Sequence, residues 1–255
     1  MSDNMRKVVL SSAMFILFFS LTNAQALWKT KRVELNAGLG TTQFFGDIGG
    51  FTPEDNILGF KDITLKQTRF NFSFDISYRI IQEANLRLNL AYGMFRATDN
   101  RGSNINRGFD ATTSFFEPSL IGEYYVIKNR SEGSFLFSRG RGGSLRSFFE
   151  TLDFYLFTGI GGLSYNVKGN DQLVAHPGFT EGGFTAVIPA GIGINMIFSP
   201  ELNFGVELGG RYSFSDYLEG YTSQYSRSND VYYFLSVTAT YKMRTTVLGV
   251  PTFRR

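Results

Sequence analysis

The chain has 255 residues and no cysteine, which excludes disulfide bonds, zinc–thiolate sites and cysteine nucleophiles. Its formal net charge is +3, aromatic residues make up 16% of it, and it contains 28 glycines, a composition that agrees with a membrane β-barrel. Beyond the first two dozen residues no apolar run is long enough for a helix across a bilayer, so a closed barrel is the membrane-spanning form that remains.

Residues 1–24 are predicted to be a cleaved signal peptide. A basic pair beginning at Arg6 precedes an apolar run that is short for a membrane helix, and small residues follow it. Cleavage after Ala24 satisfies the small-residue rule, and so does cleavage after Ala26. The remainder, 25–255, is expected to be one outer-membrane β-barrel domain, because no linker rich in Pro or Ser divides it.

Eight segments are predicted to be strands, because apolar and polar side chains alternate along them and successive strand side chains point to opposite faces. The clearest begins at Phe70, from which every second residue to Ile80 is apolar. One segment is ambiguous, since Phe154 and Leu156 compete with their neighbours Tyr155 and Phe157 for the apolar face. The eight predicted strands are 32–45, 69–80, 86–94, 114–127, 152–165, 184–198, 202–213 and 230–241.

The predicted connections alternate between long and short, as the two ends of an outer-membrane barrel require. Two are tight turns, at 81–85 and 199–201, and one expected turn is replaced by the long insertion 128–151. The long connections, which are expected to face outward, are 46–67, 98–113, 166–183 and 214–229. The sequence therefore predicts an all-β fold, an eight-stranded antiparallel transmembrane barrel.

The two faces of the predicted strands favour a membrane barrel over a soluble ligand-binding barrel. The polar face is rich in the small residues Gly, Ser and Asn, which suit a narrow lumen, whereas the other face carries Phe, Tyr and Leu, as a lipid-facing band would.

Charged side chains on several polar faces are predicted to meet in the lumen. An eight-stranded barrel has room for little besides side chains, so they are expected to form a salt-bridged plug rather than a channel, with Glu207 and Arg211 as a candidate pair. The predicted lumen network is Glu34, Arg69, Asp75, Arg79, Arg87, Glu117, Glu123, Glu207 and Arg211.

In the predicted topology, the charged residues outside the strands differ between the outer and the inner end of the barrel. The outer loops are net acidic, whereas basic residues gather in the 128–151 insertion and in the tail 242–255. Such a rim is either a surface for a periplasmic partner or solvated charge without a partner. The predicted partner surface consists of Lys128, Arg130, Arg139, Arg141, Arg146, Lys242 and Arg244.

The residues that carry catalysis or hold cofactors are sparse. His176 is the single histidine and lies in an expected loop, and although Ser215 and Asp216 lie in another loop, a triad is the disfavoured interpretation. The glycine-rich fragments at 159–162 and 191–195 lie within strands, so they are not phosphate-binding loops. The sequence predicts no enzyme, no cofactor, no metal, no nucleic-acid partner and no small-molecule substrate.

Several segments resemble the small outer-membrane barrels of Bacteroidota, a family that includes the PorG component of the type IX secretion system. They are GTTQFFGDIGG at 40–50, EPSLIGEYYVIK at 117–128, FYLFTGIGG at 154–162, FSDYLEGY at 214–221 and NDVYYFLSVTATYK at 229–242. The resemblance implies an accessory or assembly component of a protein secretion system, in the outer membrane of a Gram-negative bacterium and in contact with periplasmic subunits. The alternative is a small channel or surface-binding barrel with no role in secretion.

Overall fold

The structure is a computed structural model, and the predicted signal peptide, 1–24, lies outside the residues that it describes. The described residues are 27–49, 65–100, 105–129, 134–138, 148–223, 226, 229–246 and 250–252.

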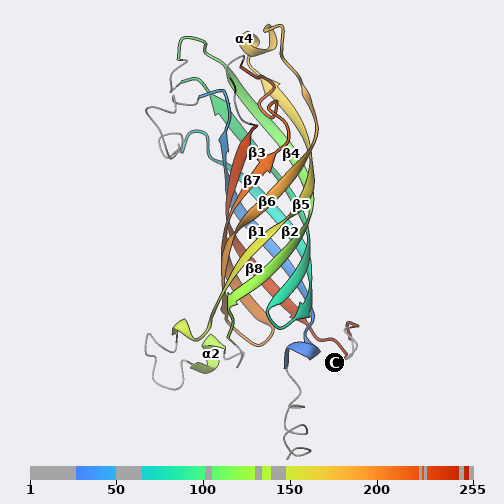
Figure 1. The fold of residues 1–255 in the computed structure, drawn as a ribbon. Coiled ribbons are helices and arrows are strands. Elements are labelled where there is room, and N and C mark those ends of the chain that lie inside the picture. Colours follow the sequence, from blue (N-terminus) through green and yellow to red (C-terminus); the bar gives the residue numbers. More distant parts are fainter. Residues whose placement is uncertain are drawn as a thin grey trace, which may run out of the picture.

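Eight antiparallel strands close into a barrel, in which each strand pairs with its neighbours in the chain and β1 pairs with β8 (Figure 1). The predicted all-β fold and all eight predicted strands are confirmed. The strands are β1 (Val33–Phe45), β2 (Arg69–Ile81), β3 (Ala84–Thr98), β4 (Asp110–Ile127), β5 (Leu152–Gly169), β6 (Gly182–Ile197), β7 (Leu202–Ser213) and β8 (Val231–Met243).

The two ends of the barrel differ in the connections that they carry. Figure 1 shows α4 (Asp171–Val174) with the long connections at one end, here called the outer end, and α2 (Phe135–Ser138) at the other, the inner end. The chain enters the inner end through the 3-10 helix η1 (Leu27–Thr30). Within the described residues, no helix is long and apolar enough to cross a membrane.

The outer wall of the barrel is apolar over most of its height. Leu39 is 72% exposed and Ile160 is 70% exposed, and exposed Phe, Leu, Ile, Val and Tyr side chains occur on all eight strands. The alternate positions of the same strands are buried inside the barrel. The predicted division into an apolar outer face and a mainly polar inner face is confirmed.

The structure also settles the face of β5. Tyr155 and Phe157 point inward and are buried, whereas Leu156 is exposed. Glycines on β6 make room for these rings: a Cβ added to Gly193 would lie 2.2 Å from the Tyr155 ring, and one added to Gly191 would lie 2.6 Å from the Phe157 ring. Large inward side chains therefore require glycine on the neighbouring strand.

Candidate functional site

Arg87 is the centre of a buried charge cluster in the lumen. Its guanidinium nitrogens lie 2.5 Å from Glu207, 3.0 Å from Glu123 and 3.8 Å from Asp75, and its side chain is 2% exposed. The Tyr155 hydroxyl donates a second hydrogen bond to Glu207, at 2.5 Å. Strands β2, β3, β4, β5 and β7 each contribute one member, so the cluster joins distant parts of the barrel wall.

Two further ion pairs lie in the lumen. Arg79 pairs with Glu34 near the inner end. Arg211 lies 3.5 Å from Glu117, which also accepts a hydrogen bond from the Tyr232 hydroxyl at 2.6 Å. These contacts bring together eight of the nine residues predicted for the lumen network, in three separate groups.

The expected pairing of Glu207 with Arg211 is wrong, because each has another partner. The two residues are four positions apart on β7, which is about 13 Å along a strand. The long Arg87 side chain reaches Glu207 across the lumen instead.

Arg69 lies apart from the rest of the predicted network. Its guanidinium donates to the backbone carbonyls of Lys66, at 3.0 Å, and Thr68, at 2.7 Å. The residue begins β2 at the outer end of the barrel, directly after the carbonyls that it binds.

Stacked aromatic rings fill the outer half of the lumen. Phe95 lies 4.7 Å from Phe44, 5.4 Å from Phe115 and 5.6 Å from Tyr232, measured between ring centroids. All four rings are buried. This cluster was not predicted from the sequence. The signal that could have indicated it is Tyr232, an aromatic residue at a position of β8 that faces the lumen.

A cavity of about 10 Å³ remains between the charged and aromatic halves of the lumen, lined in part by Phe157, Glu207 and Arg211. This volume is about that of a single water molecule's probe sphere. The predicted plug therefore agrees with the packing, and it has two parts, one ionic and one aromatic.

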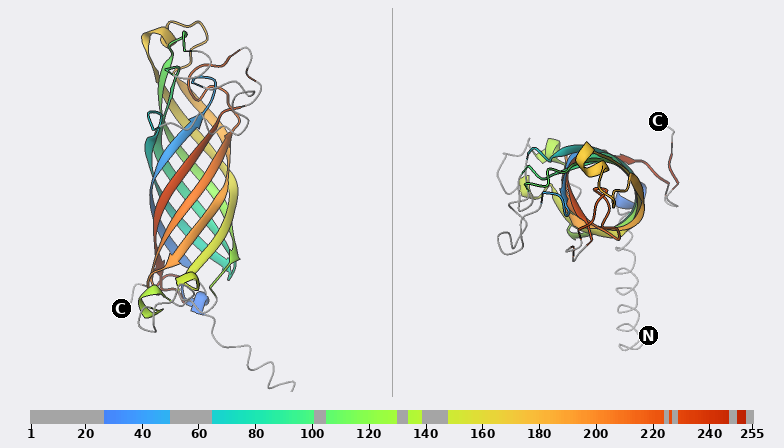
Figure 2. Two further views of the ribbon diagram at one scale, coloured as in Figure 1. Left: turned by 90° about the vertical axis from the view of Figure 1, so that its left-hand side faces the viewer. Right: turned by 90° about the horizontal axis from the view of Figure 1, so that it is seen from above.

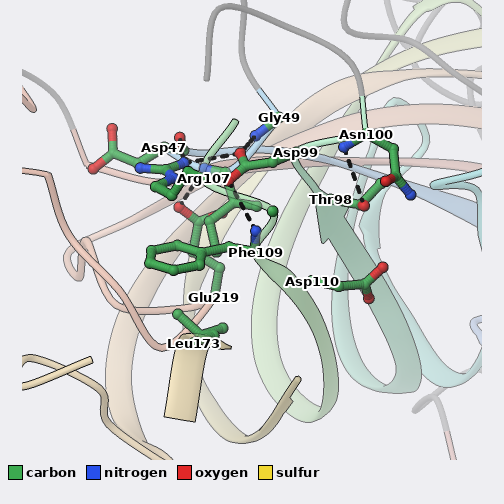
Figure 3. Close-up of polar contacts among 12 residues, drawn as sticks. Asp47, Gly49, Thr98, Asp99, Asn100, Arg107, Phe109, Asp110, Leu173 and Glu219 are labelled. Carbon is green, nitrogen blue, oxygen red and sulfur yellow. Dashed lines mark hydrogen bonds and ion pairs between the residues drawn. The ribbon is translucent and has the colours of Figure 1, made fainter. Parts of the chain in front are cut away.

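The outer connections fold over the aromatic rings and are held by a buried carboxylate. Asp99 accepts hydrogen bonds from the backbone of Gly49 at 2.9 Å and of Phe109 at 3.1 Å, and it forms an ion pair with Arg107 at 2.7 Å (Figure 3). Arg107 also donates to the carbonyl of Asp47. This network joins the connections after β1 and after β3 into one cap.

Two buried carboxyl groups lie in the same cap. Glu219 accepts a hydrogen bond from the amide of Ile48 at 2.8 Å, and Asp230 accepts one from the amide of Leu218 at 2.9 Å. Burial raises the pKa of Glu219 well above its ordinary value, and the negative charges of Asp230 and Asp47 raise it further. Burial likewise raises the pKa of Asp230.

The residues considered for a triad are not joined to one another by their hydrogen bonds. The His176 ring packs edge-on against Tyr221 and Phe109, and its Nδ1 accepts from the Gly178 amide. Ser215 bonds to Tyr165, and Asp216 accepts from Thr222. In the part of the chain that the structure describes, no group of three His, Cys, Asp or Glu residues could hold a metal ion.

The described members of the predicted partner surface are not all at the surface. Lys128 is buried in an ion pair with Asp153 at 2.8 Å, and Lys242 is 1% exposed, on an inward-facing position of β8. Both were expected on the rim, but Lys128, directly after β4, and Lys242, within β8, turn their side chains into the inner end of the lumen. Arg244 is exposed and pairs with Glu201. Outside the described residues lie Arg130, Arg139, Arg141 and Arg146.

A closed antiparallel barrel with a filled polar and aromatic interior and an apolar outer wall has the architecture of membrane barrels, because closure satisfies every strand edge and the outer wall matches lipid. Exposed aromatic residues border the band at both ends, with Tyr124 and Tyr241 toward the inner end and Tyr212 and Tyr233 toward the outer end. The chain therefore has the architecture of an eight-stranded transmembrane β-barrel of the outer-membrane type.

No protein-family model matches the chain, and no curated protein matches it. Among solved structures, the chain resembles Neisserial surface protein A, with a TM-score of 0.43 and 14% identity over 82% of this chain and 96% of the other. The chain also resembles a major outer membrane protein from Thermus thermophilus, with a TM-score of 0.41 and 13% identity over 82% of this chain and 98% of the other. For Ail, the attachment invasion locus protein of Yersinia pestis, the TM-score is 0.38 and the identity is 11%, over 82% of this chain and 98% of the other. Likeness at this level carries no information on ligand or activity.

Proposed function

We propose that this barrel is a non-enzymatic accessory or assembly component of a protein secretion system of the type IX kind, and that it contacts periplasmic subunits through its inner rim. The observation that carries the proposal is the filled lumen. Charged and aromatic side chains pack across the lumen, and the cavity lined by Phe157, Glu207 and Arg211 holds only about 10 Å³, so the two ends of the barrel are the better candidates for a function. The resemblance to the Bacteroidota barrels supports a secretion role for the inner end.

The described part of the inner rim supports this proposal because three segments are held together there. Lys31 donates to the carbonyl of Pro200 at 2.5 Å, Arg244 lies 2.8 Å from Glu201, and the amide of Thr245 donates to Thr30 at 2.6 Å. Between them lies an open groove of about 660 Å³, whose charged lining residues are Lys31, Arg244 and Glu201, so that basic side chains outnumber the carboxylate. A partner with acidic side chains would fit such a groove electrostatically.

The test reverses charge in the insertion between β4 and β5. The triple variant Arg139→Glu, Arg141→Glu and Arg146→Glu should insert and fold, because these residues lie outside every strand predicted from the sequence. Secretion should fall, and crosslinks to a periplasmic partner should be lost and should weaken as salt rises, since charges are screened over about 8 Å at physiological ionic strength. A matched control reverses three basic residues of the outer connections, Lys61, Lys66 and Arg101. Unchanged secretion and unchanged crosslinks in the insertion variant would show that the rim is only solvated charge.

The channel alternative has less support from the packing. Ions would have to pass both the Arg87 cluster and the rings around Phe95, and the cavity between these two groups is only about 10 Å³. A surface-binding barrel without a secretion role stays as the alternative, and the insertion variant separates it from the proposed function.

A further inference from the structure

A group of apolar side chains lies outside the barrel at its inner end and is not covered by other described residues. We call it the aromatic foot: Phe135, Leu136, Phe148, Phe149 and Phe198. Three segments contribute to it, namely α2, the helical turn at 148–150 and the residue that follows β6. Phe149 is 62% exposed and Leu136 is 51% exposed. Water would be an unfavourable environment for so much clustered apolar surface.

The aromatic foot is a packed arrangement. The Phe135 ring stacks on Phe198 and meets the edge of Phe148, with 6.3 Å between centroids in both cases. The amide of Leu136 donates to the carbonyl of Phe198 at 3.3 Å. Both the amide and the hydroxyl of Thr151 bond to the carbonyl of Phe148, which holds the short turn against the start of β5. The exposed rings are therefore presented by a structure with defined contacts.

The foot continues the lipid-facing wall of the barrel. Phe198 packs edge-on against Phe204, with their centroids 5.5 Å apart. Phe204 is an outward, exposed residue near the inner end of β7, and Val206 and Leu208 follow it on the same face. Ring contacts thus connect Phe204 on the lipid-facing wall to Phe149 through the other phenylalanines of the foot.

The position of the foot fits the membrane rather than the mouth of the lumen. Figure 1 places α2 below and to one side of the inner ends of the strands, and the view along the barrel axis in Figure 2 places it outside the ring of strands. Surrounding lipid occupies the same side of the wall. The segment cannot lie in the hydrocarbon core, because its non-helical backbone groups would be left without hydrogen bonds there.

We propose that the aromatic foot docks into the inner leaflet of the bilayer, at the boundary between phospholipid headgroups and acyl chains. Aromatic side chains are enriched at this depth, and apolar surface is removed from water there while backbone groups stay hydrated. The foot would tie the insertion between β4 and β5 to the membrane surface. This proposal concerns lipid as the partner and does not depend on a role in secretion.

A fluorescent reporter in the full-length barrel tests this directly, because Trp28 is the only tryptophan of the chain. In a Trp28→Phe background, Phe148→Trp places the reporter in the foot, and Phe149→Trp provides a second reporter in case the first disturbs packing. Two matched controls carry the reporter elsewhere. Ile192→Trp lies on the lipid-facing wall, and Leu65→Trp lies at the outer end, where the native residue is 93% exposed.

Each variant is folded into phosphatidylcholine vesicles that contain lipid brominated near the headgroup end of its acyl chains. The proposal expects quenching of the foot reporters at least half as strong as that of Ile192→Trp, and protection from aqueous iodide. Quenching no greater than that of Leu65→Trp, with full access to iodide, would overturn it. The proposal would equally be overturned if the foot reporters became protected only after a periplasmic extract was added, because the partner would then be a protein.

Discussion

Replacement of Arg87 by Leu should destabilise the barrel more than any other single change in the lumen network. Arg87 is the cation shared by three carboxylates, at 2.5 Å from Glu207, 3.0 Å from Glu123 and 3.8 Å from Asp75. The substitution leaves all three in a packed lumen. Because the Arg87 side chain is only 2% exposed, water cannot take its place without opening the packing.

The expected loss follows from the burial of these groups. Removing one partner of a buried ion pair costs about 3–5 kcal/mol, because the charge left behind is neither hydrated nor paired. Three carboxylates share this arginine, so we expect a loss at the upper end of that range. The double variant Arg87→Leu with Glu207→Leu should lose less than the sum of the two single changes, since the second change removes one stranded carboxylate.

The assay is urea unfolding of barrels folded into lipid vesicles, followed by far-ultraviolet circular dichroism and by the gel mobility of unheated samples. Arg244→Leu is the control, because its pair with Glu201 is exposed and its loss should leave the unfolding midpoint unchanged. The pair Glu207→Leu and Arg211→Leu should be nearly additive, since these residues have different partners. Additive losses for Arg87 and Glu207, or a loss for Arg87→Leu no larger than that of the control, would refute the assignment of Arg87 as the centre of the cluster.

Three further predictions concern the rest of the lumen and the outer cap. Phe95→Ala should lower the unfolding free energy by about 3–5 kcal/mol, since a buried ring is removed from a stack, and urea unfolding measures this. Planar bilayers should show no channel openings for the native barrel, and steady openings would contradict the packed lumen. The pKa of Glu219 is raised in the folded cap, so the cap should be most stable in acid, where Glu219 is protonated in both the folded and unfolded states. This stability should be lost as the pH rises above the ordinary value of 4.5 toward the folded pKa. Glu219→Gln should reduce this loss, measured as hydrogen-exchange protection of the Ile48 amide below pH 4.5 and at increasing pH above it.

The strands could be predicted from the sequence because a barrel in lipid must present an apolar side chain at every second position. Where this demand is strict, as from Phe70 to Ile80, the predicted and observed strands differ by one residue. Beyond the bilayer, an apolar side chain is no longer required at every second position. β5 continues to Gly169, past the predicted end at Tyr165, although Asn166 and Lys168 are polar, because pairing with β4 persists where the outward side chains meet water.

The lumen was harder to predict because alternation specifies a face but not the reach of a side chain. Arg87 contacts a carboxylate on the far wall, a choice set by side-chain length and barrel diameter. Lys242 was expected on the rim, yet its position in β8 turns it inward. Inward rings such as Tyr155 are accommodated by glycines on the adjacent strand, so their placement depends on the register between strands rather than on either strand alone.

The two ends of the barrel differ in a way that bears on where a partner could bind. At the outer end, Asp99 and the connections around it fold inward and bury Leu218 against the aromatic part of the plug, and the apolar side chains that stay exposed there, such as Leu65 and Val174, come from separate connections. At the inner end, the aromatic foot and Arg244 stay exposed after the barrel has folded. Apolar surface that remains exposed in a folded protein is stabilised only by something outside it. The packed and exposed rings of the foot therefore support the proposed contact of the inner end with the membrane.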